Sequence, residues 1–116
     1  MSKESEDKYK LVKSSEGKVS RPPGERIREV FSNTDIGIAE AEVKDAKLHY
    51  HEQMEEIYYV VEGEGKMVLD GEQMGLEKGD LLHIPPGVEN KAQGGFKVLV
   101  ISKPPWSEDD HRLVRE

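Results

Sequence analysis

The chain of 116 residues contains no cysteine. A disulfide framework and a thiolate metal site are therefore excluded. Aromatic residues are scarce, at 6%, and hydrophobic residues reach only 34% against 35% charged residues, so any core has to be small. This length is close to that of the commonest single domain, and we expect one domain.

Long apolar runs and an excess of basic residues are also absent. No apolar stretch approaches the roughly 20 residues needed to cross a bilayer, and no hydrophobic segment of the signal-peptide kind follows the polar first residues. The 17 Lys and Arg residues are scattered among 24 Asp and Glu residues, which gives a net charge of −7. Because phosphate-backbone binding needs clustered positive charge, we expect neither nucleic acid nor a membrane as partner, and we expect a cytoplasmic protein.

Composition divides the chain into three parts. Residues 1–24 are polar and end in the turn signal Pro22-Pro23-Gly24, so we expect a flexible N-terminal arm that is disordered or pairs with a sheet edge of this or a second subunit. Residues 25–103 form the compact domain. Residues 104–116 form a charged C-terminal tail that trails into solvent, and His111 within it is expected to be solvated.

Short strand-like segments joined by turns fill the compact domain. Period-2 alternation is clear over residues 36–43, and Asp70-Gly71 between two apolar segments is a strong hairpin signal. No segment has a convincing helical pattern. Eight segments have strand character: 27–31, 36–43, 46–51, 56–61, 66–69, 72–76, 81–84 and 96–101. Closely spaced short strands are typical of an all-β sandwich or barrel.

Two histidines one residue apart are the centre of the candidate site. On a strand, His49 and His51 share a face because alternate side chains lie on the same side. Glu56 begins the next predicted strand and can face the same pocket if the two strands lie in one sheet. Two neutral nitrogen donors and one carboxylate in a facial arrangement form a divalent-metal site with open positions for substrate.

The spacing of these residues resembles the two sequence motifs of small single-domain cupins. The first motif is matched by His49-Tyr50-His51, four residues, Glu56, six residues and Gly63, and the opening of the second by Gly79, five residues and Pro85-Pro86-Gly87. The resemblance covers roughly residues 35–103. It implies a double-stranded β-helix, or jelly-roll, barrel that is often a homodimer and holds a divalent metal ion inside its mouth.

The resemblance also implies a ligand set, with one departure. His49, His51 and Glu56 match the family's metal ligands, whereas Asn90 occupies the position at which the second motif has its histidine ligand. Asn90 can still act through its amide oxygen, a weaker donor, or hydrogen-bond a metal-bound water. Glu55 is an alternative to Glu56 because the family also permits three residues after the second histidine, but the gap to Gly63 favours Glu56.

Two further residues are candidates for catalysis. Tyr58 shares the face of Glu56 in a regular strand, where it either hydrogen-bonds a ligand or simply packs in the barrel. His83 either turns into the pocket, as a substitute ligand or acid–base group, or is an ordinary histidine on the outer face or at a dimer contact.

Two functions are favoured for this site, ahead of a third in which a barrel without metal serves dimerisation alone. The first is a metal-dependent enzyme of isomerase, lyase or dioxygenase type that uses Fe, Mn, Ni, Co or Zn and acts on a sugar or a carboxylic or hydroxy acid. The second is a cupin that binds a small ligand without turnover, favoured by the asparagine at position 90. The sequence leans towards the enzyme and does not choose a reaction, because one fold hosts many.

Overall fold

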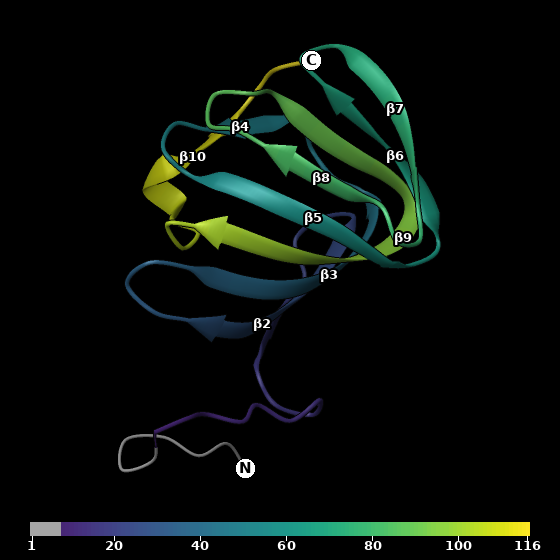
Figure 1. Cartoon of the computed structure of the whole chain (residues 1–116). Helices are drawn as coiled ribbons and strands as arrows, with labels where there is room; N and C mark the ends of the chain where they lie inside the picture. The colour runs from purple at the N-terminus through teal and green to yellow at the C-terminus, as the bar shows by residue number, and fades with distance from the viewer. Residues whose placement is uncertain (1–7) are drawn as a thin grey trace.

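The computed structural model describes residues 8–116, which form a curled all-β structure without an α-helix (Figure 1). No helix in this range is long and apolar enough to cross a membrane. The elements in chain order are β1 (Lys18–Ser20), β2 (Glu25–Ser32), β3 (Gly37–Asp45), β4 (His49–His51), β5 (Glu55–Glu62), β6 (Glu64–Leu69), β7 (Glu72–Glu77), β8 (Leu81–Ile84), β9 (Asn90–Lys103), the 3-10 helix η1 (Glu108–Asp110) and β10 (His111–Leu113).

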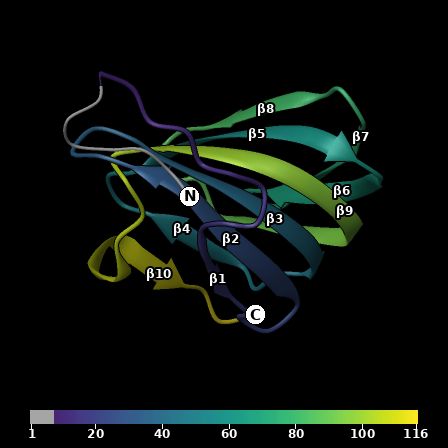
Figure 2. The same ribbon diagram turned by 90° about the horizontal axis from the view of Figure 1, so that it is seen from below.

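The strands form two layers that share one long strand. Residues 96–103 of β9 pair with β3 and β5, which extend through β2 and β1 on one side and β8 on the other. Residues 90–93 of β9 pair with β6, and Asn90 also pairs with β4, so that β7 and β10 form the edges of the second layer. All pairs are antiparallel, and the two views show the layers facing each other (Figures 1 and 2). The predicted jelly-roll barrel is thus confirmed.

A glycine corner lets β9 pass from one layer to the other. Gly94 and Gly95 have φ angles of 118° and 76°, which residues with a side chain rarely adopt. A Cβ atom on Gly94 would lie 2.8 Å from the Cα atom of Gly65, and one on Gly65 would lie 2.6 Å from a ring atom of Phe96. The corner therefore needs glycine on both strands.

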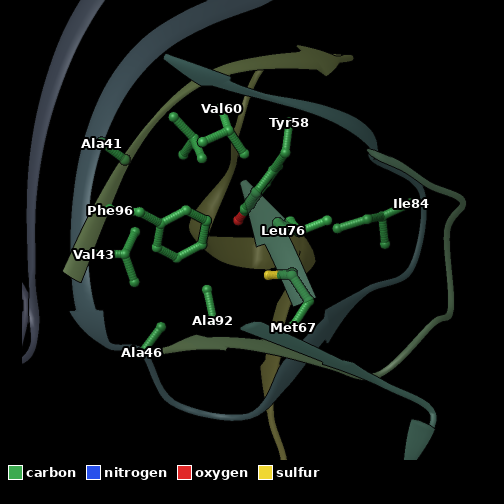
Figure 3. Packing of buried hydrophobic residues seen from close by; sticks show 11 residues of the cluster. Ala41, Val43, Ala46, Tyr58, Val60, Met67, Leu76, Ile84, Ala92 and Phe96 are labelled. Atoms are coloured by element: carbon green, nitrogen blue, oxygen red, sulfur yellow. The ribbon is translucent and has the colours of Figure 1, made fainter. Parts of the chain in front are cut away.

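The core fills the space between the layers (Figure 3). Val60, Met67 and Val98 are fully buried, and Val43 and Phe96 nearly so. These side chains come from β3, β5, β6 and β9 and occupy the end of the barrel interior, or lumen, away from the histidines. Complete burial of a Val or Met side chain contributes about 1.5–3 kcal/mol, so a few residues suffice to hold a small barrel together.

Each of the eight predicted segments contains a strand, although in the segment 46–51 only residues 49–51 are one. The sequence also missed three features. The strand predicted from residue 96 begins at Asn90, and the short edge strands β1 and β10 were not foreseen. Residues 18–20 of the predicted arm pair with β2 of the same chain, which matches the alternative of a sheet-edge contact; residues 1–7 lie outside the described range. The domain boundaries at residues 24 and 103 stay a prediction.

Candidate metal centre

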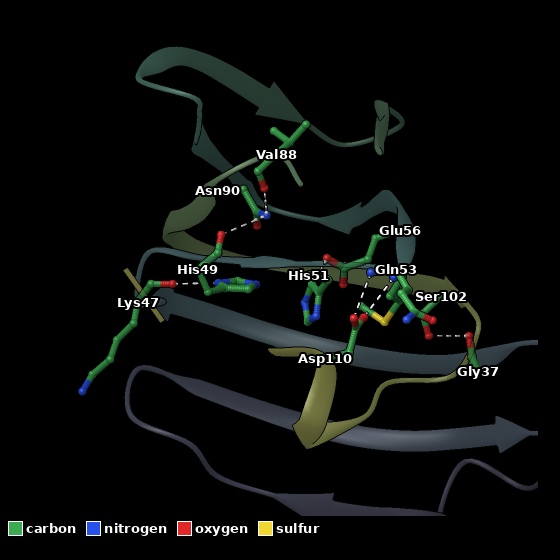
Figure 4. Close-up of polar contacts among 11 residues, drawn as sticks. Gly37, Lys47, His49, His51, Gln53, Glu56, Val88, Asn90, Ser102 and Asp110 are labelled. Carbon is green, nitrogen blue, oxygen red and sulfur yellow. Dashed lines mark hydrogen bonds and ion pairs between the residues drawn. The ribbon is translucent and has the colours of Figure 1, made fainter. Parts of the chain in front are cut away.

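His49, His51 and Glu56 come together at one end of the lumen (Figure 4). Each offers one ligand atom, and these atoms all lie within 4.8 Å of one another. Both histidines come from the short strand β4, where their i, i+2 spacing gives them the same face. Glu56 comes from the start of β5, and its side chain is buried, as is that of His51. The metal ligands expected from the sequence are therefore brought together.

A backbone carbonyl fixes the tautomer of His49. The Nδ1 atom of its ring lies 2.8 Å from the carbonyl oxygen of Lys47. Because a carbonyl only accepts, Nδ1 carries the hydrogen and donates it, which leaves a lone pair on Nε2. A metal-binding histidine is oriented by a hydrogen bond of this kind.

Buried polar atoms without a partner concentrate at this site. Among the described residues, the buried side-chain atoms that lack a hydrogen-bond partner are His51 Nδ1, Glu56 Oε1 and Asn90 Oδ1. The other ring nitrogen of His51, Nε2, is 3.8 Å from Glu56 Oε1, too far for a hydrogen bond. Each buried polar atom without a hydrogen-bond partner lowers the stability of the fold by about 1–3 kcal/mol. Three such atoms therefore indicate that the site binds a polar ligand or a cation.

Asn90 faces the same space as His49, which lies directly opposite it across the β4–β9 pair. Its Nδ2 atom donates to the carbonyl oxygens of Val88, at 3.1 Å, and of His49, at 3.4 Å. Two carbonyl acceptors fix which end of the amide carries the nitrogen. The amide oxygen is thereby left without a hydrogen-bond partner, and its lone pairs are available to a metal ion or a bound water.

Burial sets the charge state of the site. Desolvation, with the neighbouring His49 and His111 rings, lowers the pKa of His51 to about 4, against the opposing pull of Asp110. Desolvation also lowers the pKa of His49. Desolvation, with the charge of the half-buried Glu25 as a smaller cause, raises the pKa of Glu56 to about 7. The imidazoles are therefore neutral at neutral pH, with lone pairs available. A cation beside Glu56 would stabilise the charged form of its carboxylate, which burial disfavours. This donor set fits a divalent metal ion.

Tyr58 lies deeper in the lumen than Glu56. It is buried, and its hydroxyl points towards the middle of the barrel (Figure 3). Desolvation, together with the charges of Glu56 and Glu25, raises the pKa of this phenol well above its ordinary value of 10. Tyr58 therefore stays protonated at neutral pH and keeps a hydrogen to donate into the lumen.

His83 and Glu55 lie on the outer face. His83 is opposite Ile57 in the β5–β8 pair, whereas Glu56 is opposite the buried Ile84. The Nε2 atom of His83 lies 2.7 Å from an oxygen of Glu55, and both side chains are about half exposed. The sequence left open whether His83 turns inward and whether Glu55 or Glu56 joins the histidines; strand alternation turns His83 and Glu55 outward and Glu56 inward.

The C-terminal residues supply two neighbours that sequence reasoning missed. The prediction that His111 is solvated is wrong: its ring centre lies 4.9 Å from that of His49 and 5.3 Å from that of His51. The side chain of Asp110 accepts hydrogen bonds from the backbone N–H groups of Gln53, at 2.8 Å, and Met54, at 2.9 Å. Nothing in the local sequence signals either contact, because both join segments that lie far apart in the chain.

Comparisons with known proteins agree with this fold. A family model for the cupin domain matches residues 39–101. The uncharacterized protein MJ1618 of Methanocaldococcus jannaschii is 37% identical over an alignment of 92 residues that covers 73% of this chain and 74% of that protein.

Two solved structures share the fold at low sequence identity. Pac13 of Streptomyces, a nucleoside dehydratase, superimposes with a TM-score of 0.86 at 21% identity, over 94% of this chain and 92% of Pac13. Variants of Pac13 have been solved with uridine. KdgF from Halomonas sp. superimposes with a TM-score of 0.74 at 23% identity, over 85% of this chain and 96% of that one. At these identities the likeness is one of fold alone.

Proposed function

Because the chain belongs to the cupin family, we propose that His49, His51 and Glu56 hold a divalent metal ion and that the protein is an enzyme acting on a small polar metabolite. The metal is Fe, Mn, Ni, Co or Zn, all of which accept imidazole and carboxylate ligands. The observation that carries this proposal is that the ligand atoms of His49, His51 and Glu56 lie within 4.8 Å of one another, where buried polar atoms of His51 and Glu56 lack a hydrogen-bond partner.

The chain's own residues prepare the site for a cation. His49 is held by Lys47 with Nε2 free, His51 is neutral because its pKa is lowered, and Glu56 supplies the negative charge. Asn90 presents its amide oxygen beside them as a weak fourth donor or as a partner for a bound water. When bound, such an ion polarises the oxygen atoms of a substrate as a Lewis acid or, if it is iron, can support dioxygenase chemistry.

The donor set points to a substrate with adjacent oxygen atoms. Three protein ligands leave open positions on a six-coordinate ion, which suit the chelating oxygens of a sugar, a hydroxy acid or a carboxylic acid. The diol-bearing uridine found with Pac13 variants supports this class. Tyr58 is the residue that we expect to donate a hydrogen bond to the part of the substrate that reaches into the lumen.

Metal content is the first test of this proposal. We expect about one divalent ion per chain after metal-free protein is dialysed against each of the five metals in turn and analysed for its elements. His49→Ala and His51→Ala should lose the ion and keep the circular dichroism spectrum of the fold. His83→Ala is the matched control, because this histidine lies outside the barrel, and it should keep the ion. No metal in the wild type under any of these conditions would contradict the proposal.

A binding protein without turnover is the second candidate. The neutral Asn90, in place of a fourth ionic or imidazole ligand, is the observation that favours it. A metal-free binder should keep its affinity for uridine or a hydroxy acid in His49→Ala, whereas the enzyme should lose it. The homodimer and the cytoplasmic location also stay predictions, and sedimentation of the full chain tests the first.

A further inference from the structure

The C-terminal strand β10 lies beside β4 at the mouth of the barrel, and both views show the two strands together (Figures 1 and 2). They pair antiparallel, with His111 directly opposite His51. Residues directly opposite each other in such a pair project from the same face of the sheet. Since His51 points into the lumen, β10 delivers a third imidazole to the same side.

The three rings have the spacing of ligands to a common ion. Their centres are 5.1 Å apart for His49 and His51, 4.9 Å for His49 and His111, and 5.3 Å for His51 and His111. Two imidazoles that bind one ion at metal–nitrogen distances of about 2.1 Å and angles of about 90–110° have ring centres roughly 4.6–5.3 Å apart. The observed triangle, almost equilateral, lies within that range.

The tail is held in place by bonds that do not involve the histidine itself. Asp110 binds the N–H groups of Gln53 and Met54 in the loop that leads from β4 to β5, and the N–H of Val114 donates to the carbonyl oxygen of Leu48. His111 therefore sits between two anchors and remains half-buried at the mouth. Its ring is not in the group whose ligand atoms all lie within 4.8 Å of one another, so binding requires the ring to turn towards the shared point.

We propose that His111 supplies the third imidazole to the ion held by His49, His51 and Glu56, from a strand at the C-terminus instead of the second-motif position occupied by Asn90. This inference rests on the proposed function. With His111 as a ligand, the site consists of three histidines and a glutamate. Metal binding is then coupled to the pairing of the C-terminal strand β10 with β4.

Isotope-labelled imidazole groups test this directly. The chain has four histidines, and three of them form the cluster, so His83 serves as an internal control. Full-length metal-free protein with ¹⁵N-labelled histidine is titrated with ¹¹³Cd²⁺, which shows a one-bond coupling only to a nitrogen that binds it. We expect couplings to three imidazoles and none to His83.

The outcomes separate this inference from the proposed function. Couplings to His49 and His51 alone, with His111 uncoupled, would overturn the inference and leave the metal site standing. The absence of coupling to any imidazole would overturn both. Because the coupling is measured on the wild type, the test does not depend on the folding of a variant.

Affinity measurements give a second, independent readout. We expect His111→Gln to bind Zn²⁺ about 10–100-fold more weakly than the wild type, and the matched variant His83→Gln to bind it unchanged. Introducing the family's histidine at the second-motif position, in the double variant His111→Gln with Asn90→His, should recover most of the loss. Equal affinity of His111→Gln and the wild type would overturn the inference.

Discussion

Glu55 and Glu56 are neighbours in the sequence and lie on opposite sides of the barrel wall. Glu56 is buried beside His51, with 3.8 Å between its Oε1 atom and His51 Nε2, whereas Glu55 pairs with His83 on the outer face. The two carboxylates differ in environment and not in chemistry, which makes them a matched pair for experiments on the site.

Exchange of each glutamate for glutamine should separate metal binding from surface charge. We expect Glu56→Gln to weaken the binding of Zn²⁺ at least about 100-fold, because it removes the charged ligand. Glu55→Gln should change the affinity less than about threefold, because exposed ion pairs contribute little. Calorimetric titration of the two variants measures both. Similar losses in the two variants would contradict the assignment of Glu56.

Glu56 should also make the stability of the metal-free protein depend on pH. The pKa of Glu56 is raised from 4.5 to about 7, so the folded state holds a proton that the unfolded state has lost in this interval. Stability from this group is therefore lost as pH rises from about 4.5 to about 7, by roughly 3 kcal/mol in all. The lowered pKa of His51 acts the other way, with stability lost as pH falls from 6.5 towards about 4.

Glu56→Gln isolates the carboxylate from the histidines. Relative to the wild type, the variant should gain stability between about pH 5 and about pH 8, in urea unfolding with a chelator present. A difference between the two proteins that stays constant across this range would contradict the raised pKa.

The fold was largely predictable from the sequence because its signals are local. Period-2 alternation, the Asp70-Gly71 turn and the two cupin-like motifs each occupy one short continuous stretch of the chain, and the structure places them as expected. Asp70 and Gly71 have φ angles of 48° and 86°, the positive values of the hairpin turn that Asp-Gly favours. The exact start of β9 was missed because Asn90–Gln93 lacks an apolar alternation of its own.

The site was predictable only in part because its remaining members come from distant segments. His111 is 60 positions from its partner His51, and its strand has only three residues, too few for any pattern. Asp110 is one of two adjacent aspartates that look alike in the sequence, yet only its carboxylate caps the N–H groups of Gln53 and Met54. Such pairings depend on how the whole barrel closes.

Asp110 should therefore matter for the mouth of the barrel, and its neighbour Asp109 should not. We expect Asp110→Ala to destabilise the protein by about 1 kcal/mol and to speed hydrogen exchange at the amides of Gln53 and Met54. Asp109→Ala, the control, should leave both amides protected. Equal exchange rates in the two variants would contradict this role.

The pH dependence of this contact has a defined sign. Burial opposes the charge of Asp110, but the N–H groups of Met54 and Gln53, with His51, outweigh it and lower the pKa below its ordinary value of 3.8. The contact therefore stabilises the protein above about that pH and is lost as pH falls through the lowered pKa.

Tyr58 should ionise only when the barrel opens. Its pKa is raised well above 10 by burial and by the charges of Glu56 and Glu25, so its phenolate should appear together with alkaline unfolding, seen by ultraviolet absorption. Tyr58→Phe should lack this late step, and the control Tyr50→Phe should keep it. Metal content should be unchanged in Tyr58→Phe, because the phenol is not a ligand. A late step that persists in Tyr58→Phe would contradict the assignment.

Asn33 and Asn90 use opposite ends of their side-chain amide groups. Asn33 accepts hydrogen bonds at Oδ1 from the N–H groups of Asp35 and Ile36, whereas Asn90 donates from Nδ2 to the carbonyl oxygens of Val88 and His49. An aspartate keeps the acceptor but loses the donor. We therefore expect Asn33→Asp to have little effect on the metal-free protein and Asn90→Asp to destabilise it by at least about 2 kcal/mol at neutral pH.

The deficit of Asn90→Asp should shrink in acid, because a protonated carboxyl group regains one hydrogen to donate to these carbonyl oxygens. It should also shrink when Zn²⁺ is added, because the new carboxylate then faces a cation. Chemical unfolding at about pH 5 and about pH 7, with and without Zn²⁺, measures both effects. Equal destabilisation by the two substitutions would mean that the amide of Asn90 is turned the other way, with its nitrogen and not its oxygen facing the metal site.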